Sequence, residues 1–251
     1  MRKQLKFLKN RLARVIRDVE RNTASYPEIL VEFTSTLRKA RIIAGRNLNR
    51  HAKPKINSLD APEVECIGKG KARTPYEFGC KATITSTNGR AKGGMFILHA
   101  DALHGNPFDG HTLGEALKQT TALTGVTPKR AHVDKGYRGH KQKLKTPDPA
   151  SGLPTRPSWQ VFISGRKALK PSLKAELKRR SAIEPVIGHM KADHRMGKNH
   201  LKGRSGDRFN VKMAAIGFNF RRILKWLEAL VLWLTVWMWA NTAGLRKMAV
   251  C

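Results

Sequence analysis

Residues 112–134, TLGEALKQTTALTGVTPKRAHVD, decide the fold class of this chain. The first part, Thr112–Thr124, predicts a helix, and Arg130–Val133 predicts a short buried strand that ends at Asp134. Gly136 then breaks the strand. A helix that leads into a buried strand is typical of an α/β layer, in which ligands bind at the carboxyl ends of the strands.

The neighbouring segments extend this pattern in both directions. Alternating residues in 76–85 and 95–103, with the turn Asn88-Gly89 between them, predict an antiparallel hairpin. Another strand is expected at Trp159–Ser164, followed by a helix. The order hairpin, helix, strand, helix predicts an α/β fold with a mixed sheet flanked by helices.

Helices are expected at both ends of the chain. Apolar residues recur at three-four spacing from Leu5 to Val19, and Pro27 starts a second helix, so residues 2–47 predict a helical hairpin. A final helical region starts near Asp207. We therefore expect three parts: the hairpin (1–55), the α/β core (56–200) and a C-terminal helical region (201–251).

The charge of the chain indicates an anionic partner. Lysine and arginine number 49 against 18 aspartates and glutamates, which gives a formal net charge of +31. The electric field of such a charge attracts polyphosphates at long range, and the affinity of the chain for them should fall steeply as the salt concentration rises. DNA or RNA is the first candidate, and an anionic membrane surface is the second.

The apolar tail and the cysteines give further information about the partner and the cellular compartment. The tail 230–240, LVLWLTVWMWA, is shorter than the roughly 20 apolar residues that span a bilayer, so we expect a helix packed on a core or a partner and no membrane span. Three cysteines without metal-ligand spacing indicate a reducing cytoplasm, free buried thiols and no disulfide.

One acid lies between two bases in the segment RRSAIEPVIGHMK, residues 179–191. Arg180, Glu184 and Lys191 follow at steps of four and seven residues, which is one face of a continuous helix. A carboxylate among bases could hold a metal ion while the bases hold a nucleic-acid backbone. The alternative is an ordinary surface ion pair between Arg180 and Glu184.

The strand end carries a second candidate acid, Asp134, in AHVDKGYRGH. Gly136 and its neighbours let a ligand approach the backbone closely, and Tyr137 and Arg138 could contact a nucleotide backbone. Asp134 and Glu184 together could bind Mg²⁺ or Mn²⁺, because such ions take a few carboxylates plus water and phosphate oxygens. The alternative is that Asp134 caps the following turn.

Several longer strings resemble one known family. They occur in the order found in bacterial insertion-sequence transposases of the DDE class, in the branch numbered four and five, and together they cover nearly the whole chain: SLDAPEVECIGKGKARTPYEFGCK (58–81), HGNPFDGHTL (104–113), VDKGYRGH (133–140), RRSAIEPVIGHMKADHRMG (179–197) and LKGRSGDRFN (201–210). The resemblance implies an RNase H-like catalytic core.

The resemblance also implies roles for individual residues. Asp134 matches the second catalytic aspartate and Glu184 the catalytic glutamate, so both would bind the metal ion. Arg180 and Lys191 match the basic members of the family's tyrosine, arginine, glutamate, lysine signature. The tyrosine position of that signature is Leu177 here.

The first catalytic aspartate of the family has no clear counterpart in this chain. In relatives it lies on a strand ahead of a helical insertion, and the hairpin 2–47 resembles that insertion, so we expect an incomplete RNase H-like core and an N-terminally truncated transposase. Asp60 is nearest by position, where relatives tend to carry histidine, and Asp109 is expected to form a turn beside Gly110.

These expectations define the functions to be compared. A transposase would cut and join DNA at its element ends and target, act in the bacterial cytoplasm at the nucleoid, and could be a homodimer. Lys69 and Lys71 in the GKGKAR loop would add sequence-independent affinity. The alternatives are a non-catalytic DNA- or RNA-binding protein and, third, a protein that binds membrane surfaces through its tail.

Overall fold

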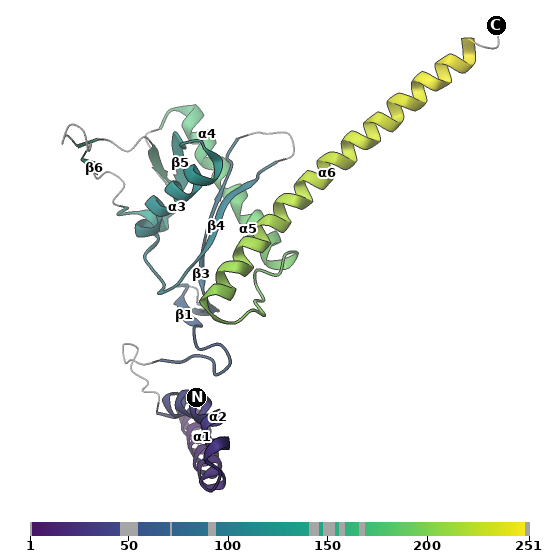
Figure 1. Cartoon of the computed structure of the whole chain (residues 1–251). Coiled ribbons are helices and arrows are strands. Elements are labelled where there is room, and N and C mark those ends of the chain that lie inside the picture. The colour runs from purple at the N-terminus through teal and green to yellow at the C-terminus, as the bar shows by residue number, and fades with distance from the viewer. Residues whose placement is uncertain are drawn as a thin grey trace. The chain divides into compact units, whose positions relative to one another are not determined.

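The computed structural model describes residues 2–45, 55–70, 72–89, 94–140, 146–147, 154–155, 159–165 and 169–248 (Figure 1). The chain divides into two compact units. Unit 1 comprises Met1–Lys81 and Lys202–Arg204, and unit 2 comprises Ala82–Leu201 and Ser205–Cys251. Each unit is described separately. The predicted three-part division at residues 55 and 200 remains a prediction.

The helical hairpin of unit 1 confirms the N-terminal prediction over the described residues. Helix α1 (Arg2–Thr23) packs against α2 (Pro27–Ala44), which has its proline in the first turn. The apolar stripes of the two helices form one small core: Leu12, Ile16, Val19, Leu30, Leu37, Ala40 and Ala44. Residues 46 and 47, the end of the predicted hairpin, lie outside the described residues.

Unit 1 also contains an antiparallel strand pair, of which the sequence predicted only one member. Strand β1 (Glu65–Gly68) pairs with β2 (Tyr76–Gly79). The run 76–85 was expected as one strand, but it divides after Gly79, whose φ of +147° is a conformation that side-chain-bearing residues rarely adopt. Along β1 Ile67 is buried and Cys66 is exposed, so the expectation of buried thiols is wrong for Cys66.

Unit 2 contains the segment that decides the fold class. Strand β3 (Lys81–Ser86), which starts at the last residue of unit 1, pairs with β4 (Ile97–Leu103), and α3 (Asp109–Thr124) packs on β4. The chain then turns at Gly125, whose φ is +68°, and enters β5 (Arg130–Val133). Strand β5 is parallel to β8 (Gln160–Ile163). The predicted helix 112–124 and the predicted strands 130–133 and 159–164 are confirmed, the last as Gln160–Ile163.

The strands that the structure describes do not join into one sheet. Within the described residues there are four separate pairs, the last being β6 (Thr146–Pro147) with β7 (Pro154–Thr155). Parallel and antiparallel pairs both occur, so the α/β class is confirmed, while the expected single mixed sheet is replaced by small sheets. The RNase H-like core therefore remains a proposal.

The helix predicted to carry Arg180, Glu184 and Lys191 is interrupted. Helix α4 (Pro171–Arg179) is followed by a 3₁₀ turn, η2 (Arg180–Ala182), and then by α5 (Ile183–Ala192). Pro185 lies in the first turn of α5 and has no backbone N–H to bond back to Ser181, so the α-helical ladder cannot run through this point. The prediction of one continuous helix is therefore wrong.

A polar network fixes α4 against β5. The Glu176 carboxylate accepts hydrogen bonds from His132 Nε2 at 3.1 Å and Arg130 Nε at 3.0 Å. The Glu176 carbonyl accepts one from Asn88 Nδ2 at 2.9 Å, and Arg179 Nε donates to the Asn88 carbonyl at 3.2 Å. The strand that ends at Asp134 and the helix that leads toward Glu184 are thus tied together.

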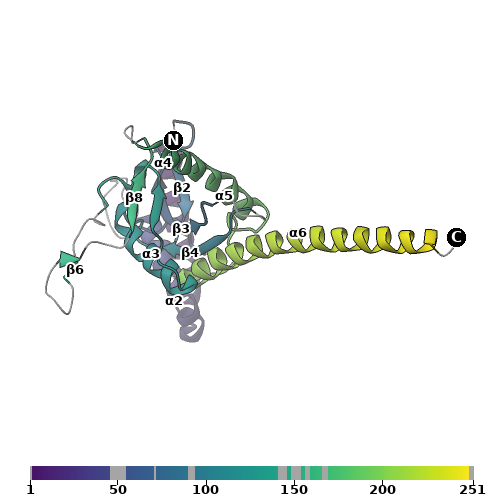
Figure 2. The same cartoon turned by 90° about the horizontal axis from the view of Figure 1, so that it is seen from above.

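Helix α6 (Gly203–Met248) has one face in the core of unit 2 up to Phe218. The core comprises Thr83, Ile97, His99, Ala100, Ala102, Leu113, Ala116, Leu117, Thr120, Phe162, Val186, Met190, Val211, Ala214, Ala215 and Phe218. The C-terminal part of α6 extends away from the other elements of unit 2 in both views (Figures 1 and 2).

The apolar tail is exposed instead of packed on the core. Residues 230–234 and 236–239 are all large, apolar and exposed, so the packing predicted for the tail is wrong as far as the core of unit 2 is concerned. None of the helices in the described part of the chain combines the length and the apolar character needed to cross a membrane.

Candidate active site

The predicted acid Asp134 lies directly after β5 and starts the 3₁₀ turn η1 (Lys135–Tyr137). Its side chain is exposed, and its Oδ1 accepts a hydrogen bond from the Gly136 backbone N–H at 2.8 Å. The capping role considered for this residue is therefore present. Capping uses one carboxylate oxygen, and the acid is still presented at the carboxyl end of the strand.

A second acid borders the same point. A Cβ placed on Gly136 would lie 2.8 Å from Asp109 Oδ2 and 3.0 Å from Asp134 Oδ1, so both carboxylates lie beside this glycine. Asp109 is the first residue of α3 and was expected only to form a turn. The local sequence gives no sign of this pairing, because the start of α3 and the end of β5 meet only through the fold.

Tyr137 lies near the two acids. Its hydroxyl hydrogen-bonds with the side chains of Thr112 and Thr83. Burial raises the pKa of this phenol, and the negative charges of Asp109 and Asp134 raise it further. The hydroxyl is therefore held in its neutral form inside unit 2, and the predicted contact of Tyr137 with DNA remains a prediction.

The acid and bases of the second motif lie around η2 and α5. Arg180 Nη2 is 3.6 Å from Glu184 Oε1, so the two side chains form an ion pair but are too far apart for a hydrogen bond. Glu184 and Lys191 lie seven residues apart on the exposed face of α5, while Val186 and Met190 are buried on the opposite face. The side chain of Glu184 is 70 % exposed and accessible to an ion from solvent.

The other predicted DNA contacts lie apart from these acids in the sequence. Lys69, between β1 and β2, pairs with Glu77 at 2.8 Å, and Arg138 is exposed after η1. Lys71 lies outside the described residues. Within the described part of the chain, Asp134 and Glu184 have no hydrogen-bond or ion-pair partner in common.

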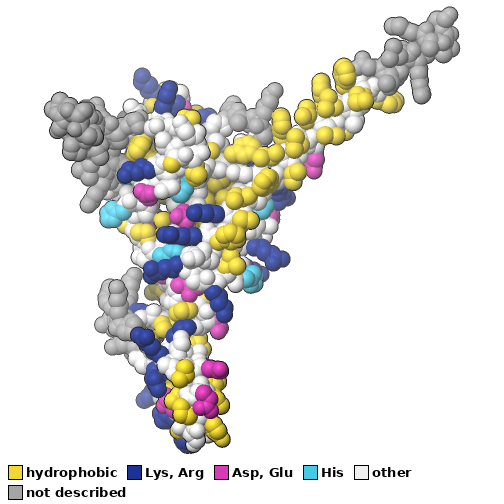
Figure 3. Space-filling view, viewed as in Figure 1, with side chains coloured by type: hydrophobic (Ala, Val, Ile, Leu, Met, Phe, Trp, Pro, Cys, Tyr) yellow, Lys and Arg dark blue, Asp and Glu magenta, His cyan; other side chains and the backbone are white. Residues whose placement is uncertain are grey.

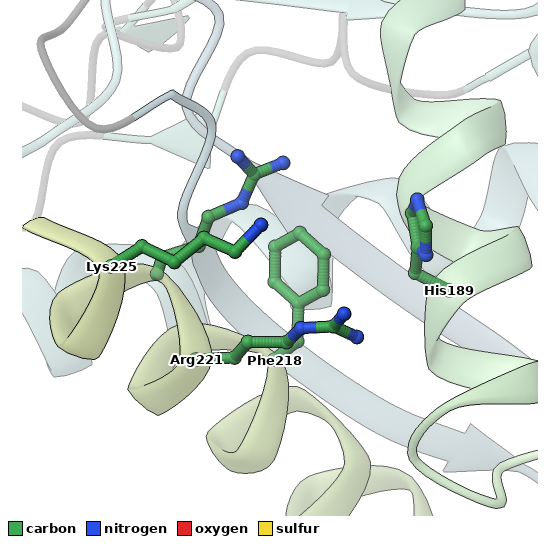
Figure 4. Close-up of a pocket in the computed structure, with 5 residues that line it drawn as sticks. His189, Phe218, Arg221 and Lys225 are labelled. Carbon is green, nitrogen blue, oxygen red and sulfur yellow. The ribbon is translucent and has the colours of Figure 1, made fainter.

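A basic pocket between α5 and α6 was not predicted. It has a volume of about 240 Å³ and is lined by His189, Phe218, Arg221, Arg222 and Lys225, here called the basic pocket. Figure 4 shows His189 on one helix facing the side chains of Arg221 and Lys225 on the other, with the Phe218 ring between them. The two helices are joined in sequence only through residues 193–202, so motif spacing could not reveal the pocket.

The charges of the basic pocket are only partly neutralised. Asp193 accepts hydrogen bonds from His189 Nδ1 at 2.9 Å and from Arg221, and these bonds lower the pKa of Asp193. The Arg222 guanidinium lies 5.1 Å from the centre of the Phe218 ring. One carboxylate thus faces three permanent cations, an arrangement that suits a phosphate group.

One of the comparisons with known proteins matches a segment that contains the second motif. Residues 156–224 match the family model described as a transposase DDE domain. The matched segment contains Arg180, Glu184, Lys191 and most of the basic pocket, and Asp134 precedes it. The searches of curated proteins and of solved structures found no match. The family match supports a DDE transposase, a class of enzyme that cuts and joins DNA.

Proposed function

We propose that this chain is a transposase of an insertion sequence, of the branch numbered four and five, that acts on DNA by metal-dependent phosphodiester transfer. The observation that carries the proposal is the match of residues 156–224 to a transposase DDE domain, because this segment contains Arg180, Glu184 and Lys191. The net charge of +31 supports DNA as the partner. Element ends and target DNA in the bacterial cytoplasm, at the nucleoid, would be the substrates.

Asp134 and Glu184 are the proposed ligands of Mg²⁺ or Mn²⁺. The donor set suits these ions: Asp134 and Asp109 turn carboxylate oxygens toward Gly136, and the Arg180 partner of Glu184 is too distant to hold it by a hydrogen bond. A bound ion would supply Lewis-acid activation of the phosphodiester and of the attacking oxygen. Asp109 would add negative charge beside Asp134.

The residues around these acids would position the substrate. Arg180 and Lys191 lie near Glu184 in the sequence and would hold the DNA backbone next to it, and Arg138 would do the same beside Asp134. The basic pocket would hold a further phosphate. Lys69 and Lys71 would add affinity that does not depend on sequence.

Catalysis by these acids alone should be weak. Two carboxylates can hold one cation loosely, whereas in-line transfer commonly uses two cations that clamp both reacting oxygens. For efficient strand transfer, a core of this kind would need a third carboxylate to hold the metal ions. We therefore propose that the chain binds DNA and a divalent ion but is impaired in strand transfer.

A strand-nicking assay tests the proposed chemistry. Purified chain, supercoiled plasmid carrying the element ends and Mg²⁺ should give slow nicking that EDTA abolishes. Glu184→Gln should reduce the nicking rate at least ~10-fold, since it removes a ligand charge without changing size. Glu115→Gln, a change of the same kind on an exposed position of α3, serves as the control and should nick at the unchanged rate. Nicking that is insensitive to both EDTA and Glu184→Gln would contradict the proposal.

The basic pocket gives a prediction about affinity. Arg222→Gln with Lys225→Gln removes two cations and leaves the Arg221–Asp193 pair intact. Binding to a DNA duplex should fall about 10-fold at ~0.1 M salt, and the slope of log affinity against log salt should decrease by about 2, because two phosphate contacts are lost. Fluorescence anisotropy over a salt series measures both.

The control for this prediction removes the same charge elsewhere on unit 2. Lys118 and Lys129 are exposed and lie outside the basic pocket. Lys118→Gln with Lys129→Gln should change the salt slope by less than half as much. Equal losses for the two double variants would mean that only net charge matters and that the basic pocket holds no phosphate.

A non-catalytic nucleic-acid binder is the second candidate. It is favoured by the structural roles that the two acids already have, Asp134 as a turn cap and Glu184 as an ion-pair partner. A plain binder would hold DNA equally well with and without Mg²⁺, would be unaffected by Glu184→Gln and would not nick. The nicking assay and the anisotropy measurement together separate the two candidates.

A further inference from the structure

The exposed side of α6 has a regular apolar repeat. Large apolar residues alternate at spacings of four and three, and every one of them is 39–60 % exposed; they form the α6 stripe: Phe209, Met213, Ile216, Phe220, Ile223, Leu227, Leu230 and Leu234. In heptad notation Met213 is an a position and Ile216 a d position. A seam of a and d positions sustained over about four heptads is the pattern of a coiled coil.

The two sides of α6 are clearly distinct up to Phe218. The residues that face the core are Val211, Ala214, Ala215 and Phe218, all at b, c or f positions. The α6 stripe lies on the other side of the helix, so the core of unit 2 does not cover it. Packing within unit 2 therefore accounts for one side only, and Figure 3 shows hydrophobic side chains continuing along α6 at the surface.

The charged residues of α6 are placed away from the α6 stripe. From 207 to 239, all of them except Lys212 fall at b, c or f positions: Asp207, Arg208, Arg221, Arg222, Lys225 and Glu228. The flanking e and g positions from 224 onward are apolar, among them Leu224, Trp226 and Val231. Two copies of a chain with a charge of +31 could thus meet along this seam without placing cations opposite each other.

The area of this surface is sufficient for a stable interface. At about 200 Å² for a fully exposed large apolar side chain, the α6 stripe and its apolar flanks expose roughly 1,000 Å². A standard interface uses about 800 Å² from each partner. A single monomer rarely leaves an apolar patch of this size uncovered.

We propose that the α6 stripe is a self-association surface, which packs against the α6 stripe of a second copy of this chain in a coiled coil. Leucine at a (Leu227, Leu234) and isoleucine at d (Ile216, Ile223) favour more than two strands, so a third or fourth copy could join the same seam. This inference goes beyond the proposed function, because it requires neither metal nor DNA.

The test measures the mass of the full chain by sedimentation equilibrium after nuclease treatment, at roughly 0.5 M salt so that nucleic acid cannot bridge copies. The unaltered chain should have at least twice the mass of one chain. Ile223→Glu with Leu230→Glu, both at d, should reduce the mass to that of a single chain. Both positions follow Phe218, so the glutamates do not enter the core of unit 2.

A matched control places the same charges on the other side of α6. Leu232→Glu and Val236→Glu change exposed apolar residues at f and c, and this double variant should keep the mass of the unaltered chain. Circular dichroism should show the same helix content for both double variants, which excludes unfolding as the cause.

Three results would overturn the proposal. They are an unaltered chain that remains a monomer at all concentrations, a mass unaffected by Ile223→Glu with Leu230→Glu, and equal effects of the two double variants. Vesicles of anionic lipid form the last arm of the test. Vesicle binding by a monomeric chain that is lost in the d-position variant would assign the α6 stripe to a membrane surface instead.

Discussion

Asparagine in place of Asp134 is expected to weaken Mn²⁺ binding by the full chain at least ~10-fold. Loss of residues that merely support a metal ligand commonly costs 10- to 100-fold in affinity, so loss of a ligand charge should cost at least as much. Asn keeps the size of the side chain and can still accept the hydrogen bond from Gly136 N–H. Titration of free Mn²⁺ by electron paramagnetic resonance gives the affinity directly.

A second variant tests the arrangement of the acids without removing either one. In Gly136→Ala the new methyl would lie within 3.0 Å of carboxylate oxygens of both Asp109 and Asp134, so the carboxylates must shift away from the methyl and their present arrangement is lost. Mn²⁺ affinity should fall although both charges remain. Gly68→Ala is the control, because a Cβ there meets no atom within 4 Å. Unchanged Mn²⁺ affinity in both Asp134→Asn and Gly136→Ala would remove Asp134 from the proposed metal site.

Leu117→Ala is expected to lower the free energy of unfolding of unit 2 by about 3 kcal/mol. Leu117 is 3 % exposed on the face of α3 that packs against the core, so its truncation removes buried apolar surface and leaves a cavity. Leu123, on the same helix, is 67 % exposed, and Leu123→Ala should cost less than about 1 kcal/mol.

Urea unfolding followed by tryptophan emission measures this difference. All five tryptophans lie in unit 2, at positions 159, 226, 233, 237 and 239. The last four are exposed on α6 and Trp159 is half-buried beside β8, so the change in emission on unfolding comes mainly from Trp159 and reports unit 2 alone. The comparison should be made at constant chain concentration, because self-association through α6 would add to the apparent stability. Similar losses for Leu117→Ala and Leu123→Ala would mean that α3 is not part of the core of unit 2.

Much of the local structure could be predicted from the sequence, because it depends on local chemistry. The apolar spacing of residues 5–19 and the proline at position 27 set the helical hairpin, and the short run 130–133 has the bounds that the structure gives it. Such features need only periodicity and turn residues.

Features that depend on distant residues could not be predicted in this way. Strand β1 contains one buried residue, Ile67, and is a strand because it pairs with β2. The pairing of Asp109 with Asp134 requires α3 to return its first turn to the end of β5. The helix break at Arg180–Ala182 could have been predicted from Pro185. It was missed because the spacing of Arg180, Glu184 and Lys191 fits one uninterrupted helix.

For the candidate site, too, the residues were predicted from local sequence but their arrangement in space was not. Asp134 and Glu184 were identified from a strand end and from a motif, and the structure places one at the end of β5 and the other on the exposed face of α5. Periodicity cannot give the distance between two such residues, because it is set by the packing of elements far apart in the chain. The role of the two acids as shared metal ligands remains a prediction.

The contacts of Glu176 have a mechanical consequence. Since one carboxylate holds both His132 and Arg130, a sideways slip of α4 along β5 would have to break two polar contacts together with the link through Asn88. The strand and the helix should therefore shift as one stiff frame when a load is applied. If the chain binds DNA as proposed, a duplex held against α4 and β5 would rest on a part of the protein that deforms little, so any bending would have to come from the duplex.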